Sequence, residues 1–243
     1  MESIIRGVHK FRTGEYLRQR ELYQQLAVKQ QKPKALVITC SDSRVLPNVF
    51  AQTEPGDLFI VRNAGNIVAP HGAPGGGEAA TIEYSLEVLG IRNIILCGHS
   101  QCGAMKAILE NKSLTHLPAI DSWFKHAEST RQIVQRRYQH LEGAELAAAA
   151  TEENILVQLN NLSTHPCVAS RLAAGEVSLY GWYYDIGRGS VSQYDQQQGK
   201  FFELNGDACA AQPLPLRTSD AMPLVETNED WPDIRRNEPI AQR

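Results

Sequence analysis

The chain has 243 residues, of which 42% are hydrophobic and 21% charged, with a net charge of −3; these values are typical of a globular protein that buries a full core. The near-neutral balance gives no electrostatic basis for binding nucleic acid or an anionic membrane. No apolar run approaches the roughly 20 residues of a membrane-spanning helix, and the N-terminus lacks the apolar core of a secretory signal. The five cysteines are an odd number spread along the chain, which favours metal ligands or buried thiols in a reducing compartment over a disulfide framework. We therefore predict a cytoplasmic protein with no nucleic-acid or membrane partner.

Residues 1–30 carry helical periodicity and predict an N-terminal helical arm. Ile4, Val8 and Phe11 form one apolar stripe, and a second helix is expected after Gly14 because glycine weakens a helix interior. Helices outside a sheet core either pack on their own domain or contact another subunit, and the sequence alone leaves both arrangements open.

The middle of the chain, residues 31–205, alternates strand and helix patterns and predicts one domain. Short apolar runs predict strands, and longer helical periodicities predict helices between them. In chain order we expect strands at 35–39, 58–63 and 93–97, helices at 78–89, 103–110, 118–139, 144–162 and 166–174, and a terminal hairpin at 177–184 and 191–194. This order predicts an α/β fold with a mainly parallel twisted sheet flanked by helices and an antiparallel edge strand.

The last stretch, residues 206–243, holds five prolines and scattered charges with little periodicity. Such a composition predicts a C-terminal tail that is disordered or ordered only against a partner.

Three residues of zinc-ligand type lie at the ends of two predicted strands. Cys40 follows the first strand, while His99 and Cys102 follow the third. Residues just past the carboxyl ends of parallel strands gather in one crevice, so these side chains are expected to meet. Two thiolates and one imidazole fill three corners of a zinc tetrahedron and leave the fourth for water or a side chain. The pattern predicts a Zn²⁺ site for metal-assisted hydration or hydrolysis.

Each of these residues also has a purely structural interpretation when taken alone. A single cysteine is most often a small buried hydrophobe, and Asp42 and Ser43 could simply cap a following helix. Cys97 could add a fourth ligand to a structural zinc, but it lies within an apolar strand and is expected to be a core thiol. The chain has no Cys-x-x-Cys, which argues against a dithiol redox enzyme.

Asp42 and Arg44 are the predicted catalytic pair. A bidentate bond to the Arg44 guanidinium would hold Asp42 ionised and away from the metal. Asp42 can then accept a hydrogen bond from metal-bound water and orient it. Without that bond, Asp42 could turn onto the metal as a fourth ligand and displace the water.

Four motifs stand out at 40–45 (CSDSRV), 56–66 (GDLFIVRNAGN), 83–84 (EY) and 98–104 (GHSQCGA). Together they resemble the β-class carbonic anhydrases, and the match covers about residues 1–205. The resemblance implies that 31–205 is the catalytic domain, with Cys40, His99 and Cys102 as zinc ligands and Asp42 with Arg44 as the catalytic dyad. The implied reaction is the reversible hydration of carbon dioxide to bicarbonate and a proton by a zinc-bound hydroxide.

The same resemblance implies a substrate site shared between subunits. Gln31 matches a glutamine that donates a hydrogen bond to bound substrate or product. Phe59, Ala64 and Tyr84 fall where the family lines its carbon dioxide pocket. Family members are homodimers or higher assemblies built from dimers, and part of that pocket comes from the neighbouring subunit.

One departure from the family bears on regulation. Some bacterial relatives carry a tryptophan of a non-catalytic bicarbonate site where this chain has Val37. Arg62 matches another member of that site, and Tyr183 or Tyr184 could match a third. The absence of that tryptophan implies a weakly regulated enzyme, in which Asp42 stays paired with Arg44 at neutral pH.

The helical arm and the tail at 206–243 resemble the carboxysomal branch, in which terminal extensions engage shell or scaffold proteins. An ordinary cytosolic enzyme with an extra tail is the competing interpretation. Two other functions also stay open: hydrolysis of a carbon dioxide analogue such as carbon disulfide, and a zinc-binding scaffold or storage role without turnover.

Overall fold

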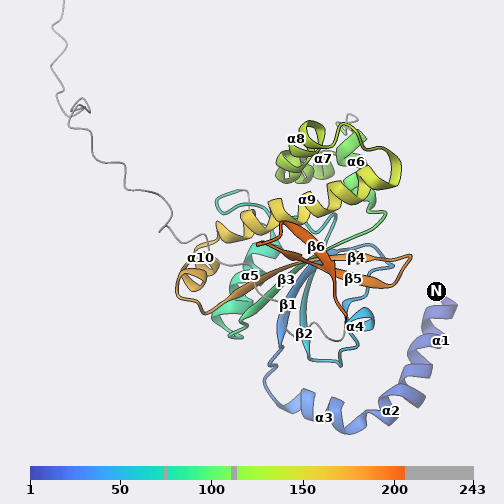
Figure 1. Ribbon diagram of the computed structural model, residues 1–243. Coiled ribbons are helices and arrows are strands. Elements are labelled where there is room, and N and C mark those ends of the chain that lie inside the picture. Colours follow the sequence, from blue (N-terminus) through green and yellow to red (C-terminus); the bar gives the residue numbers. More distant parts are fainter. Residues whose placement is uncertain (74–75, 111–113, 206–243) are drawn as a thin grey trace, which may run out of the picture.

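The computed structural model describes residues 1–73, 76–110 and 114–205, so the predicted tail at 206–243 lies outside the described residues. The strands are β1 (Ala35–Cys40), β2 (Leu58–Asn63), β3 (Asn93–His99), β4 (Ser178–Asp185), β5 (Ser190–Asp195) and β6 (Lys200–Glu203). Within the described residues they form a six-stranded sheet in the order β2-β1-β3-β4-β5-β6 (Figure 1). The first four strands of that order run parallel, and β5 and β6 are antiparallel additions. The predicted α/β class, mainly parallel with an antiparallel edge, is confirmed; β6 was not predicted.

The two central strands end at the same edge of the sheet. Every residue of β1 is buried, as expected for a parallel strand covered on both faces. The register pairs Ile38 of β1 with Leu96 of β3 and Cys40 of β1 with Asn63 of β2. Because the strands are parallel, the residues that close β1 and β3 lie in one crevice.

The helices of the body are α4 (Pro47–Phe50), α5 (Gly77–Glu87), α6 (Gly103–Glu110), α7 (Pro118–Phe124), α8 (Glu128–Arg137), α9 (Gly143–Ser163) and α10 (Pro166–Ala173). The single helix predicted over 118–139 is wrong, since a 3-10 turn at Lys125–Ala127 separates α7 from α8. The backbone leaves helical angles at Ala127 (φ −112°, ψ 12°), and this bend buries the Ala127 side chain completely. None of the described helices is long and apolar enough to span a bilayer.

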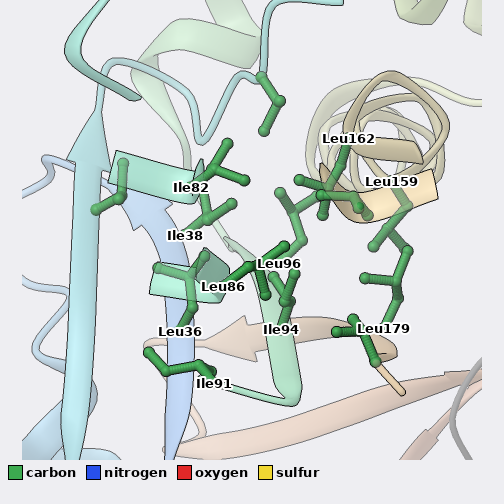
Figure 2. Packing of buried hydrophobic residues seen from close by; sticks show 14 of the residues in the cluster. Leu36, Ile38, Ile82, Leu86, Ile91, Ile94, Leu96, Leu159, Leu162 and Leu179 are labelled. Carbon is green, nitrogen blue, oxygen red and sulfur yellow. The ribbon is translucent and has the colours of Figure 1, made fainter. Parts of the chain in front are cut away.

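The main core lies where α5 and α9 pack on β1 and β3. Figure 2 shows this cluster, which includes Leu36, Ile38, Ile82, Leu86, Ile94, Leu96, Leu159 and Leu162. A smaller cluster contains Val37, Ile95 and Cys97 from the same two strands, and Phe50 of α4 packs against it. Cys97 is therefore a core thiol within the sheet.

The N-terminal arm consists of α1 (Glu2–Lys10), a π-helical turn (Phe11–Glu15), α2 (Tyr16–Arg18) and α3 (Arg20–Val28). Figure 1 shows the arm apart from the sheet and its covering helices, and none of residues 2–28, all described, is buried. The helical run passes through Gly14 instead of breaking after it, and it bends at Gln19 (φ −109°, ψ 22°). Ile4 and Val8 are 62% and 64% exposed, so within the described chain the apolar stripe faces solvent.

Candidate metal centre

The sheet edge brings Cys40, His99 and Cys102 together. Cys40 closes β1, His99 closes β3, and Cys102 precedes α6. Their two sulfurs and a ring nitrogen all lie within 4.8 Å of one another, and all three residues are buried. The spacing and the soft donor set suit a tetrahedral metal site with one position left open.

The His99 ring is oriented for a metal. Its Nδ1 lies 2.9 Å from the carbonyl oxygen of Ser100, so a neutral ring donates there and carries its lone pair on Nε2. Nε2 is buried and has no hydrogen-bond partner among the described residues. Ser100 is fixed in turn, since its N–H donates to the Tyr184 carbonyl at 2.9 Å. An orphaned, buried nitrogen beside two sulfurs fits a bound metal ion.

The two thiols titrate as a pair. A hydrogen bond with Cys102, helped by the Gly65 N–H, lowers the pKa of the Cys40 thiol to about 4 against the effect of burial. The same sulfur–sulfur contact, with burial, raises the pKa of Cys102. In this arrangement the Cys102 S–H donates to the Cys40 sulfur and favours its thiolate. A bound cation would expel that proton and take both thiolates as ligands.

Asp42 lies next to the Cys40–His99–Cys102 cluster and accepts three hydrogen bonds from Arg44. Arg44 Nε donates to Asp42 Oδ1 at 2.9 Å and Nη2 donates to Oδ2 at 2.7 Å, and the Arg44 N–H adds a third bond at 3.0 Å. The Arg44 side chain holds the pKa of Asp42 well below its usual range. Asp42 Oδ2 lies 4.0 Å from His99 Nε2, so an ionised oxygen faces the region in front of the imidazole.

Arg44 and Arg62 also bond to the backbone around the cysteines of the cluster. Arg44 Nη2 donates to the Gln101 carbonyl at 3.2 Å, and Gln101 adopts a left-handed φ of 57° that is uncommon outside glycine. Arg62 donates to the carbonyls of Cys40 at 3.1 Å and Asp42 at 2.7 Å. The sequence connected Arg62 only with a bicarbonate site, whereas here its hydrogen bonds support the segment that carries Cys40 and Asp42.

The other residues matched to that bicarbonate site lie in the sheet. Val37 is buried within β1. The ring of Tyr184 stacks on Phe50 of α4 with centroids 4.6 Å apart, and Tyr183 packs against the main core.

The predicted substrate residues lie in three separate places. Ala64 is exposed and lies next to Gly65, whose N–H donates to Cys40 Sγ at 3.4 Å. Phe59 and Tyr84 face each other with ring centroids 6.1 Å apart. Phe59 pairs in register with the residue four positions before Cys40, which is roughly 13 Å along the strand. Gln31 is exposed ahead of β1, and no hydrogen bond between described residues connects it to the cluster.

Sequence reasoning missed a set of buried and partly buried amides behind the cluster. Asn154, Gln158 and Asn161 lie four and three residues apart on α9, and they donate to or accept from the backbone of 65–68. Amide side chains repeating at a spacing of four and three residues, which places them on one helix face, were the available indication.

Comparisons with known proteins agree with this geometry. The family model described as carbonic anhydrase matches residues 35–191. A carbonic anhydrase of Synechocystis sp. is 52% identical over 196 residues, which cover 80% of this chain and 71% of that protein. A carbonic anhydrase of Pseudomonas aeruginosa is 44% identical over 204 residues, covering 84% and 92% of the two chains.

Solved structures extend the likeness to three dimensions. A structure from work on two tetrameric β-carbonic anhydrases of Sordaria macrospora is 25% identical, with a TM-score of 0.72 over 79% of this chain and 95% of that chain. The β-carbonic anhydrase CcaA is 50% identical, with a TM-score of 0.82 over 84% and 99% of the two chains. Sequence and fold together establish that the chain belongs to the β class of the carbonic anhydrase family.

Proposed function

We propose that the protein hydrates carbon dioxide reversibly to bicarbonate and a proton at the centre formed by Cys40, His99 and Cys102. The observation that carries the proposal is the cluster itself: three donor atoms within 4.8 Å, with an orphaned imidazole nitrogen and an ionised carboxylate next to them. Family membership supplies the reaction class.

We infer that Zn²⁺ is held by Cys40 Sγ, His99 Nε2 and Cys102 Sγ. When bound, zinc is a Lewis acid that lowers the pKa of water to roughly 7. The chain's contribution is to hold two sulfurs and one nitrogen at the sheet edge and to leave the fourth position open.

Asp42 orients the attacking water in this proposal. Its ionised Oδ2 accepts a hydrogen bond, which turns a water lone pair toward the carbon of carbon dioxide. The new C–O bond forms as one C=O electron pair moves to oxygen, and the water loses a proton. Because Arg44 keeps the pKa of Asp42 well below its usual range, Asp42 does not retain that proton at neutral pH. Solvent or buffer removes it.

We propose that the active unit is a homodimer or a higher assembly built from dimers. Gln31, Ala64, Phe59 and Tyr84 would line the substrate pocket. The Phe59–Tyr84 pair lies roughly 13 Å along the strand from its own Cys40, which supports a role in the pocket of a neighbouring subunit. The exposed apolar stripe of the arm supports a subunit contact.

We further propose a cytoplasmic enzyme whose tail, residues 206–243, engages a carboxysome scaffold or shell protein. The composition of the tail and the resemblance of both termini to that branch support this. Deletion of 206–243 should leave hydration intact and change localisation and assembly; unchanged localisation would favour an ordinary cytosolic enzyme.

Stopped-flow hydration of carbon dioxide tests the main proposal, with Cys40→Ala as the control. We expect turnover in the wild type, loss of turnover in Cys40→Ala, and about one zinc per chain by elemental analysis. Zinc without turnover would favour a scaffold role. Hydrolysis of carbon disulfide without hydration of carbon dioxide would favour the alternative hydrolase.

A further inference from the structure

The amide face of α9 is bonded to the loop that follows β2. Gln158 Oε1 accepts from the Val68 N–H at 2.9 Å, and Asn161 Nδ2 donates to the Val68 carbonyl at 2.9 Å. Asn154 Nδ2 donates to the Gly65 carbonyl at 3.1 Å. Asn154 and Gln158 are fully buried, and a buried amide is costly unless it is hydrogen-bonded. These amides are bonded to the loop that reaches the metal centre.

Two donors fix the orientation of the Asn154 amide. Its Oδ1 accepts from Thr130 Oγ1 at 3.1 Å and from Gln158 Nε2 at 3.0 Å. With its oxygen committed to those two donors, its NH₂ group must face the Gly65 carbonyl. Thr130 is also fully buried, so water does not compete for these bonds.

Gly65 connects this network to a metal ligand. Its N–H donates to Cys40 Sγ at 3.4 Å. Its φ of 85° is left-handed, and a Cβ there would lie 2.9 Å from Ala104 Cβ. Glycine is therefore required at this position and brings no side chain to hold the peptide in place. Hydrogen bonds from outside the loop must hold it, and Asn154 supplies one to the Gly65 carbonyl.

We propose that Asn154 is a positioning residue for the metal ligand Cys40, acting through Gly65. The Asn154 amide holds the Gly65 carbonyl, which keeps the Gly65 N–H directed at the Cys40 sulfur. The proposal rests on the proposed metal centre. Outer partners of metal ligands change metal affinity by about 10–100-fold when removed, and we expect an effect of that size.

The test compares Asn154→Leu with Asn161→Leu in the full-length chain. Both variants remove an amide of the same α9 face, and Asn161 is bonded to Val68, three residues beyond Gly65. Zinc affinity is measured by chelator competition, and the thiolate-to-metal absorption is recorded after Co²⁺ substitution. We expect Asn154→Leu to weaken zinc binding about 10–100-fold and to shift the Co²⁺ absorption. Asn161→Leu should stay within about threefold of wild type.

Thermal unfolding of both variants separates positioning from general destabilisation. Equal loss of zinc affinity in both variants, or wild-type affinity and absorption in Asn154→Leu, would overturn the proposal. Should Asn154→Leu fail to fold, Asn154→Asp keeps the shape but replaces the donor with an oxygen, and the same expected loss applies. A wild-type protein that binds no zinc would refute the metal centre itself, which distinguishes the two failures.

Discussion

A methyl group added at Gly98 tests how tightly α9 is fitted to the sheet beneath the metal centre. Gly98 lies in β3 between the core thiol Cys97 and the proposed metal ligand His99. A Cβ there would lie 2.8 Å from Thr151 Cγ2 and 3.0 Å from Ile155 Cδ1 and Cγ1. β3 is paired with β1 on one side and β4 on the other, so it cannot move away from α9. Thr151 and Ile155 are β-branched and have few rotamers in a helix, so α9 must move.

The expected cost of Gly98→Ala is that of overpacking a well-filled core, about 1–3 kcal/mol. For a chain of this size that lowers the melting temperature by roughly 2–4 °C per kcal/mol. The same displacement moves Asn154, one helical turn from Thr151. Zinc affinity should therefore fall together with the free energy of unfolding.

The assay is denaturant unfolding at one fixed protein concentration, because assembly makes stability concentration-dependent. Thr151→Ser removes the methyl group in closest contact and keeps the hydroxyl that donates to the Ala147 carbonyl at 3.0 Å. Gly98→Ala in the Thr151→Ser background should thus cost less, with a coupling of at least about 0.5 kcal/mol. Gly103→Ala, whose Cβ meets nothing within 4 Å, is the control. If the stability losses of Gly98→Ala and Thr151→Ser are strictly additive, or if Gly98→Ala is as stable as the wild type, this account is refuted.

Three further outcomes follow from the same geometry. Arg44→Gln removes the side-chain bonds that hold Asp42 ionised and in place, so the hydration rate at pH 8 should fall about 10²-fold; an unchanged stopped-flow rate at pH 8 would contradict this. Removal of zinc with a chelator should abolish turnover. When zinc is added back near pH 6, an indicator dye should report the release of about one proton from the Cys40–Cys102 pair. No release would mean that both thiols were already ionised. Deletion of 1–28 should yield smaller, less active species in sedimentation, and an intact assembly would rule out the arm as a subunit contact.

The sequence predicted that Cys40, His99 and Cys102 would meet, because these residues lie at or just past the ends of apolar strands. That position follows from the length of each run and the parallel order of the strands, and both can be read along the chain. β6 was missed because its four residues, two adjacent phenylalanines between charges, are too few to show a strand alternation. The break between α7 and α8 was missed because it depends on which faces are buried, as the fully buried Ala127 shows. Tertiary packing of that kind leaves no local pattern.

The roles of Arg62 and Asn154 needed the structure for another reason. Each acts on backbone groups of residues far away in sequence, and a hydrogen bond to a carbonyl requires no particular residue type at the receiving position. Arg62 reaches back to the carbonyls of Cys40 and Asp42, and Asn154 reaches Gly65 across 89 positions. Residue type can therefore predict which side chains could bind a metal, whereas the residues that support those side chains become visible only with the fold.

The distance between the aromatic pair and the metal ligands links activity to assembly. In one chain the ligands and Asp42 meet at the sheet edge, while Phe59 and Tyr84 lie roughly 13 Å along the strands. A substrate as small as carbon dioxide cannot contact both groups of one chain at once. If the aromatic pair serves the reaction, it must do so beside a neighbouring subunit's ligands. Turnover per chain should then fall on dilution in step with dissociation, whereas a monomer with full activity would exclude the pair from the pocket.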